Sequence, residues 1–298
     1  MSFLLLSSLG FAAMAFLTKL ACETYDGSTV AGLRFTFGAV VTGLLWATGK
    51  VDARPRALRL VLVRGATGGV AVVLYFLSVE HLSVGLATLL NYTSPPMTAV
   101  LAWIYLRERL PAAVFWALGL TFGGVLLVVA GQGEQGVGGF VKTADPFWMA
   151  MGILSAVCSA AAITSIRALR SSTPPESVWS IFFWFCVIGA VCAVPASKGL
   201  HAPNTREALL LVGVGATAML AQLGMNRVMR WVPAALFGVT AQMSVVLTML
   251  AGVMFLDEPW SLMSLAGALV TIGGVLWAVR AEGRASRAEA QGTTRRQQ

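Results

Sequence analysis

Long apolar segments with few charges are the feature that most constrains what this chain can fold into. A membrane-spanning helix needs about 20 predominantly apolar residues, and only 11% of the chain is charged while 57% is hydrophobic. A soluble domain carries roughly 25% charged residues. We therefore expect an all-α membrane protein with ten transmembrane helices. The predicted spans are 2–22, 28–48, 60–80, 83–106, 111–131, 147–169, 177–197, 206–228, 233–256 and 261–280.

The distribution of basic residues predicts the orientation of these helices. Cytoplasmic loops of membrane proteins are enriched in Lys and Arg. With the N-terminus inside, 16 basic side chains, Arg64 among them, fall on the cytoplasmic side, 4 fall outside, and Arg34 lies within a span. We therefore expect both termini to be cytoplasmic in a multi-pass protein of the cell (inner) membrane.

The net charge of +8 could also indicate nucleic-acid binding, but no nucleic-acid-binding motif accompanies the basic residues. The topology signal explains the charge better, and we expect no nucleic-acid partner. The basic tail is expected to be disordered and to lie near anionic lipid headgroups.

An internal repeat at an offset of 150 residues runs from the second predicted helix to the fifth. At this offset Phe35 corresponds to Phe185 and Glu108 to Glu258. Each copy holds an odd number of helices, five, so the second copy must enter the membrane upside down. Inverted repeats are a recurring plan of secondary transporters, although some channels share it. The predicted units are the first repeat (1–131), a linker (132–146), the second repeat (147–281) and the tail (282–298).

Two segments at corresponding positions carry a family resemblance. The first runs from residues 91–96 (NYTSPP) to 106–109 (LRER), and the second from 231–234 (WVPA) to 255–259 (FLDEP). They resemble the EamA family of the drug/metabolite transporter superfamily, which implies the five-plus-five arrangement and transport of amino acids, other metabolites or drugs. Where the family's ninth helix usually has a proline, this sequence has Val245. We therefore expect that helix to be straighter than the fourth.

The function predicted on this basis is secondary transport of a small metabolite by alternating access, with an amino acid or related zwitterion as the favoured substrate. The alternatives are a multidrug or organic-cation exporter of the same fold and, less favoured, a channel-like facilitator. No Asp or Glu lies near the centre of a span. This absence argues against a carboxylate proton relay and against a cation-binding site. The two histidines lie outside catalytic motifs, and the four cysteines show no CxxC spacing. We expect neither an enzyme nor a metal or other cofactor.

A basic side chain inside the membrane is the sharpest candidate for function. Arg34 lies about six residues into the second predicted helix, where an arginine costs up to about 2.5–3.5 kcal/mol on insertion scales. One interpretation is an ion pair with Glu23, Asp26 or Glu80 at the same end of the helices. The other is capture of a substrate carboxylate or phosphate.

Polar and aromatic side chains at mid-membrane depth complete the predicted site. Each of them could serve helix packing through hydrogen bonds or line a pocket. A substrate lacks the pseudo-symmetry of the protein, so we expect recognition where the two copies differ. The predicted substrate-binding residues are Arg34, Tyr75, Asn91, Tyr92, Trp184, Gln222 and Gln242, and Pro95 with Pro96 is the predicted hinge.

Other features that recur in both copies are predicted to have structural roles. Glu108 and Glu258 each precede a helix that starts near Pro111 or Pro259, and a carboxylate near a helix N-terminus is stabilising by about 0.3–1 kcal/mol. Stripes of glycine permit close contact within the monomer or dimerisation, so we expect a monomer or a homodimer. The glycines are Gly65, Gly68, Gly69, Gly119, Gly123, Gly124, Gly273 and Gly274.

Overall fold

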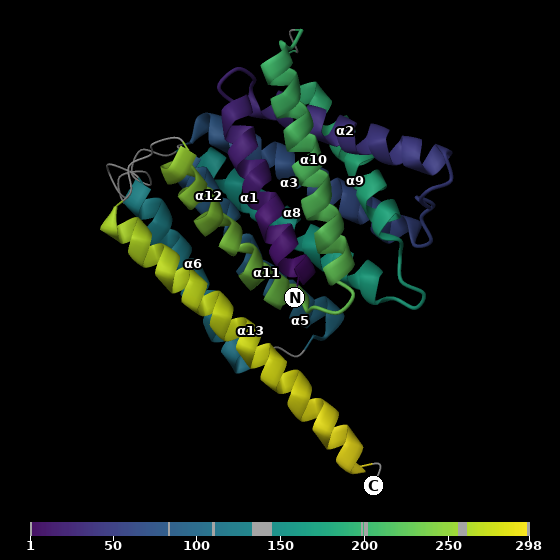
Figure 1. Ribbon diagram of the computed structural model, residues 1–298, viewed down its shortest axis with the longest axis vertical. Helices are drawn as coiled ribbons and strands as arrows, with labels where there is room; N and C mark the ends of the chain where they lie inside the picture. The colour runs from purple at the N-terminus through teal and green to yellow at the C-terminus, as the bar shows by residue number, and fades with distance from the viewer. Residues whose placement is uncertain are drawn as a thin grey trace.

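The computed structural model describes the chain except at residues 1, 83, 109–110, 133–144, 198, 200–201, 256–260 and 297–298. The described residues are helical, with short connections and no strand (Figure 1). The helices are α1 (Ser2–Ala21), α2 (Gly27–Ala47), α3 (Leu58–His81), α4 (Val84–Asn91), α5 (Ser94–Leu106), α6 (Ala112–Gln132), α8 (Pro146–Ser171), α9 (Val178–Ala193), η1 (Val194–Ala196), α10 (Thr205–Val228), α11 (Ala234–Ala241), α12 (Met243–Phe255) and α13 (Leu262–Arg296).

These helices correspond to the ten predicted spans when α4 with α5, and α11 with α12, each count as one crossing. Seven spans in the described residues are long and apolar enough to cross a membrane. Shorter apolar helices cover the positions of the predicted first and seventh spans. The all-α membrane architecture is therefore confirmed, and most of the predicted linker lies outside the described residues.

The fourth and ninth spans are both interrupted near their middle. Two residues, Tyr92 and Thr93, separate α4 from α5, and the first turn of α5 contains Pro95 and Pro96. Proline has no N–H to donate and is favoured in a first helical turn. Gln242 alone separates α11 from α12. The ninth helix thus also has a break, although it lacks a proline there and its break is one residue long instead of two; that it is straighter than the fourth stays a prediction.

Contacts between the repeats, rather than within them, build the membrane region. Helix α1 packs along α10, and α3 packs along α8, as Figure 1 shows for the first pair. Equivalent bonds join these pairs. The Ser7 hydroxyl donates to the Ala221 carbonyl at 3.0 Å, and the Ser155 hydroxyl donates to the Ala71 carbonyl at 2.7 Å. The two carbonyls are one repeat offset apart, so the two repeats interleave instead of forming separate lobes.

The repeat-related phenylalanines meet each other at the centre of this arrangement. The rings of Phe35 on α2 and Phe185 on α9 pack edge to face, with centroids 5.0 Å apart and planes at 88°. A residue that contacts its own copy lies next to the axis relating the copies. The inverted-repeat axis therefore passes between α2 and α9.

Helices α6 and α13 form a second interface between repeats, visible as two helices side by side in Figure 1. Gly124 of α6 lies against the backbone of Thr271, and Gly274 of α13 lies against Thr121. Gly65, Gly68 and Gly69 also face neighbouring helices, whereas Gly119, Gly123 and Gly273 have nothing within 4 Å of an added Cβ. Only part of the predicted glycine set therefore packs inside the monomer.

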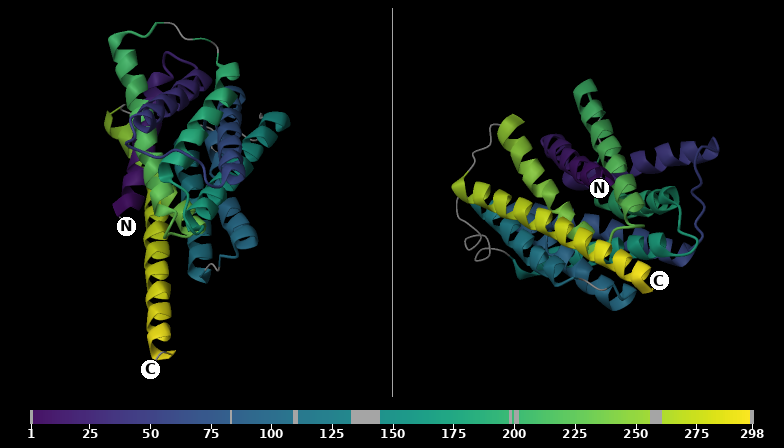
Figure 2. Two further views of the ribbon diagram at one scale, coloured as in Figure 1. Left: turned by 90° about the vertical axis from the view of Figure 1, so that its right-hand side faces the viewer. Right: turned by 60° about the horizontal axis from the view of Figure 1, so that its bottom comes forward.

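The C-terminal tail continues α13 to Arg296 as a helix, where the sequence predicts disorder. Figure 2 shows this part of the helix extending away from the rest of the protein. The tail is rich in Ala, Glu and Arg, which favour helix. A helix already formed in the membrane also supplies the nucleus that an isolated tail would lack.

The α6–α13 interface generates a paired test. In Gly124→Ala the new methyl would lie 2.7 Å from the Thr271 nitrogen and 2.8 Å from the Gly267 carbonyl oxygen. Overpacking of this kind lowers the free energy of unfolding by about 1–3 kcal/mol. We expect a lower melting temperature in detergent for Gly124→Ala and an unchanged one for Gly123→Ala, one residue away on the same helix. Equal melting temperatures in the two variants would contradict the interface.

Candidate functional site

The start of α2 places Arg34 two turns below the outer end of the helix. Asp26 caps α2, accepting hydrogen bonds from the Thr29 N–H at 2.9 Å and the Thr29 hydroxyl at 2.7 Å. Burial acts to raise the pKa of the Asp26 carboxyl, but the hydrogen bonds from Ser28 and Thr29 outweigh it, so the pKa lies below its usual range. Asp26 therefore serves its own helix and not Arg34.

Arg34 is partly buried, and it contacts a thioether and an aromatic ring. Its Nη1 lies 3.2 Å from the sulfur of Met14, and its guanidinium carbon lies 4.7 Å from the centre of the Phe35 ring. Among the residues whose side chains are described, no carboxylate lies within ion-pairing distance of it; the side chain of Glu80 is outside that set. The ion-pair interpretation of Arg34 is not supported for Glu23 or Asp26.

Arg64 is a second arginine in the membrane that the sequence analysis assigned to a cytoplasmic loop. It lies in α3 with its side chain only 3% exposed. Its Nη2 donates to the Gln222 side-chain oxygen at 3.3 Å, and its guanidinium carbon lies 4.0 Å from the centre of the Phe185 ring. The Nε and Nη1 atoms have no hydrogen-bond partner among the described residues. Without Arg64 the basic asymmetry still places both termini inside.

A local sequence signal could have identified Arg64. An added Cβ at Gly68, one turn along α3, would meet the Arg64 Nη1 and would lie 2.8 Å from the Phe185 ring. The glycine therefore makes the space into which the guanidinium folds back. An arginine followed by glycine four residues later, inside an apolar span, is the pattern to search for.

A small cavity lies between the two repeats where these side chains meet, with room for about one water molecule. Arg34 and Gln222 supply its polar lining, and Arg64, which is not itself a lining residue, donates to Gln222. Both arginines belong to the first repeat, and the second repeat offers Trp184 and Val214 at the corresponding positions. The remaining lining is apolar apart from a thiol: Phe35, Phe182, Phe185, Cys186 and Ala218.

Tyr75 and Tyr92 form a second group at the break of the fourth span. The Tyr92 hydroxyl lies beside Ser244, and Tyr75 is close enough to interact with it. Gln242, at the equivalent break, is completely buried, and neither polar atom of its amide has a hydrogen-bond partner among the described residues. Asn91 is partly buried at the end of α4. The described lining of the Arg34 cavity contains none of these four residues.

Trp184 makes a contact between the repeats, outside the described lining of the Arg34 cavity. Its indole N–H donates to the Ala53 carbonyl at 3.2 Å, in the loop between α2 and α3. The buried Glu176 carboxylate fixes the same loop by accepting from the N–H groups of Arg56 and Ala57, each at 2.9 Å. These contacts tie the cytoplasmic loops of the two repeats together.

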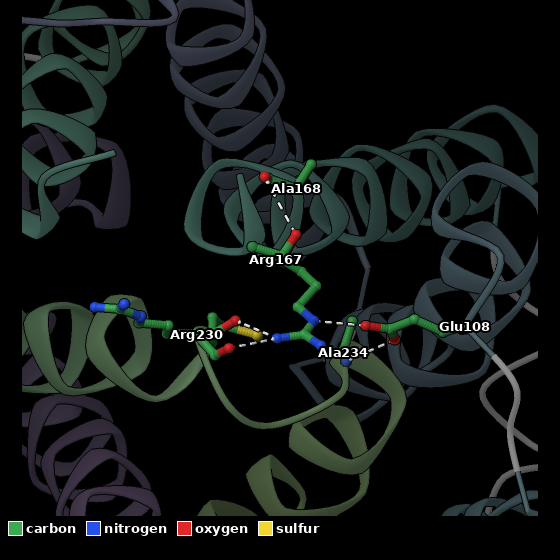
Figure 3. Close-up of polar contacts among 7 residues, drawn as sticks. Glu108, Arg167, Ala168, Arg230 and Ala234 are labelled. Carbon is green, nitrogen blue, oxygen red and sulfur yellow. Dashed lines mark hydrogen bonds and ion pairs between the residues drawn. The ribbon is translucent and has the colours of Figure 1, made fainter. Parts of the chain in front are cut away.

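An ion pair links the repeats at the same end (Figure 3). Arg167 of α8 donates from Nε to Glu108 at 2.5 Å. The other Glu108 oxygen accepts from the Ala234 N–H at 3.1 Å, at the start of α11. Arg167 Nη1 donates to the carbonyls of Met229 at 2.8 Å and Arg230 at 3.0 Å, just after α10. The Glu108–Arg167 pair therefore caps both the end of α10 and the start of α11.

These contacts give Glu108 a second structural partner. The sequence places it before the helix near Pro111 in its own repeat, and the structure shows that its carboxylate also accepts from the start of α11 in the other repeat. Proximity in sequence alone does not show where a side chain reaches across an interface. Glu258 and Pro259 lie outside the described residues.

The comparisons with known proteins agree with this architecture. The model of the EamA-like transporter family matches residues 1–130 and 146–280. The pseudopaline exporter CntI of Pseudomonas aeruginosa (strain UCBPP-PA14) is 26% identical over 269 residues, covering 90% of this chain and 91% of the relative. Solute carrier family 35 member G1 of Homo sapiens is 24% identical over 236 residues, covering 73% and 61%. A solved crystal structure with 19% identity covers 93% of this chain and 94% of its own with a TM-score of 0.77, which shows the same fold.

The Glu108–Arg167 pair can be tested by a double-mutant cycle. Glu108→Gln and Arg167→Gln should each lower the melting temperature, because each leaves the other group and the α11 cap poorly satisfied. The double variant should lose less stability than the two single variants lose together, with a coupling free energy of about 0.5–3 kcal/mol. Arg107→Gln, an exposed neighbour of Glu108, serves as the control. Strict additivity would show that the contact contributes nothing.

Proposed function

The chain belongs to the EamA-like transporter family and is a multi-pass membrane transporter, of the inner membrane in bacteria; from that premise we propose that it is a secondary carrier that moves a small metabolite by alternating access. The favoured substrate is an amino acid or a related zwitterion. The relatives matched over most of this chain are transporters, and we propose no catalytic role. One relative is an exporter of pseudopaline, which supports export of an organic metabolite here.

The observation that carries this proposal is the position of Arg34 and Gln222 between two interleaved inverted repeats. Two similar halves related by an axis in the membrane plane can exchange conformations at little cost in free energy, so a site between them can face each side in turn. The guanidinium of Arg34 suits the carboxylate of a zwitterion. The breaks beside Pro95 and at Gln242 provide positions at which the fourth and ninth helices can bend.

The two alternative functions receive less support. An organic-cation exporter would be expected to offer a carboxylate at its site, and the described cavity lining contains none. A channel-like facilitator needs a continuous polar path. The cytoplasmic ends of the repeats are joined by the Glu108–Arg167 and Glu176 contacts, and the described cavity admits only about one water molecule.

Exchange kinetics test the carrier directly. Purified protein in liposomes loaded with a mixture of unlabelled amino acids should take up the labelled substrate faster than protein in empty liposomes, because a loaded carrier returns faster than an empty one. Uptake should also saturate with external concentration. Flux that rises linearly and is indifferent to internal substrate would sink the carrier mechanism and favour a channel.

Gln242 offers a test that separates transport from packing. Its buried amide has no hydrogen-bond partner in the described part of the chain, and an unsatisfied buried polar group lowers the free energy of unfolding by about 1–3 kcal/mol. Gln242→Leu should therefore raise the melting temperature while lowering the transport rate. If Gln242 serves only helix packing, the rate should stay at the wild-type value, and that result would remove Gln242 from the site.

A further inference from the structure

Two guanidinium groups approach one small region of the membrane interior, and neither has an acidic partner among the side chains that the structure describes. Arg34 comes from α2 and Arg64 from α3, and Gln222 of α10 connects them, since it lines the cavity beside Arg34 and accepts from Arg64. The described groups around them are aromatic, aliphatic or sulfur-containing, except for that one amide. Two positive charges therefore share a site in which the described side chains supply no negative charge.

Arg64 differs from an arginine that serves only the scaffold. The nearby Arg167 shows how a scaffold arginine is satisfied, because it binds the Glu108 carboxylate and two backbone carbonyls. Arg64 is 3% exposed, yet its Nε and Nη1 bind nothing among the described residues. A buried cation with free donors is unfavourable unless an anion completes it. Its surroundings do not supply that anion.

The aromatic rings hold the two guanidinium groups at separate places. Arg34 lies over Phe35, Arg64 lies over Phe185, and the two rings pack edge to face. Each cation thus contacts a different ring of this pair. Two cations held on two rings offer one binding position each for two anionic groups of the same molecule.

We propose that Arg34 and Arg64 bind the two carboxylates of one small organic substrate, such as an acidic amino acid or another dicarboxylate. This inference rests on the proposed transport function and narrows its substrate class. Guanidinium groups bind carboxylates through two parallel hydrogen bonds, which gives both affinity and orientation. Opening of the repeats would enlarge the cavity and admit the ligand between the two cations.

Gly68 and Gln222 would then position Arg64. Gly68 leaves the space that the guanidinium occupies, and Gln222, which also lines the cavity, accepts from one of its nitrogen atoms. The Nε and Nη1 donors bind nothing among the described residues and could donate to a ligand. Gly68→Ala should therefore displace the guanidinium while keeping its charge.

Thermal stabilisation of the purified full-length protein tests this assignment. The ligands are L-glutamate and 2-oxoglutarate as dicarboxylates, L-alanine as a zwitterion with one carboxylate, inorganic phosphate, and choline as a cation. The variants are Arg34→Gln, Arg64→Gln, Arg64→Lys and Gly68→Ala. Arg59→Gln is the matched control, because Arg59 is an exposed arginine on the same helix.

We expect the dicarboxylates to raise the melting temperature of the wild type and of Arg59→Gln in a saturable way. Arg34→Gln and Arg64→Gln should weaken the apparent affinity about 10- to 100-fold. Arg64→Lys and Gly68→Ala should show intermediate affinities, since a charge remains but the paired hydrogen bonds do not. Without ligand, Arg64→Gln should be at least as stable as the wild type, whereas loss of a purely structural arginine would lower the melting temperature.

Several results would overturn the assignment. Equal stabilisation by L-alanine and the dicarboxylates would show that only one carboxylate is bound, and stabilisation by phosphate alone would show a different anion. Unchanged dicarboxylate affinity in Arg34→Gln and Arg64→Gln would place the ligand elsewhere. Saturable exchange of a substrate without carboxylates would reject the dicarboxylate while leaving the carrier function intact. Dicarboxylate binding without exchange in liposomes would instead reject the carrier function.

Discussion

Every polar group inside a bilayer must find its partner within the protein, because hydrocarbon offers none. Many of the described hydroxyls satisfy that constraint with a carbonyl one turn back in their own helix, while those of Ser7 and Ser155 bind carbonyls on the facing helix. A few buried groups keep a polar atom without a partner among the described residues: Thr42, Arg64, Arg170, Ser180, Asn226 and Gln242. Of these, Arg64 donates to Gln222, which lines the cavity between the repeats.

The interleaving of the repeats explains why that cavity lies where it does. Helices of each copy pack mainly on helices of the other, so the centre of the molecule is an interface between copies. Phe35 and Phe185 keep the symmetry of that interface, while Arg34 and Arg64 break it. A symmetric frame can exchange two conformations, and an asymmetric pair of charges inside it can recognise an asymmetric molecule.

Local patterns in the sequence predicted much of the architecture but less of the site. Apolar length, basic loops and the repeat predicted the ten spans and their orientation, and the resemblance of residues 91–109 and 231–259 to the EamA family predicted the family. Arg34 and Gln222 were identified as polar residues within spans. Arg64 was missed because it lies near the end of its helix, where loop and membrane residues look alike. The Glu108–Arg167 pair joins residues far apart in the sequence, and only the packing of α8 against α5 brings them together.

The central claim is that a substrate carboxylate lies on each arginine between the two repeats. A crystal structure of the protein grown with L-glutamate tests it most directly. The account predicts density for the ligand between α2, α3 and α10, with one carboxylate against Arg34 and the other against Arg64. Density elsewhere in the protein, or a side-chain carboxylate already bound to Arg64, would contradict it.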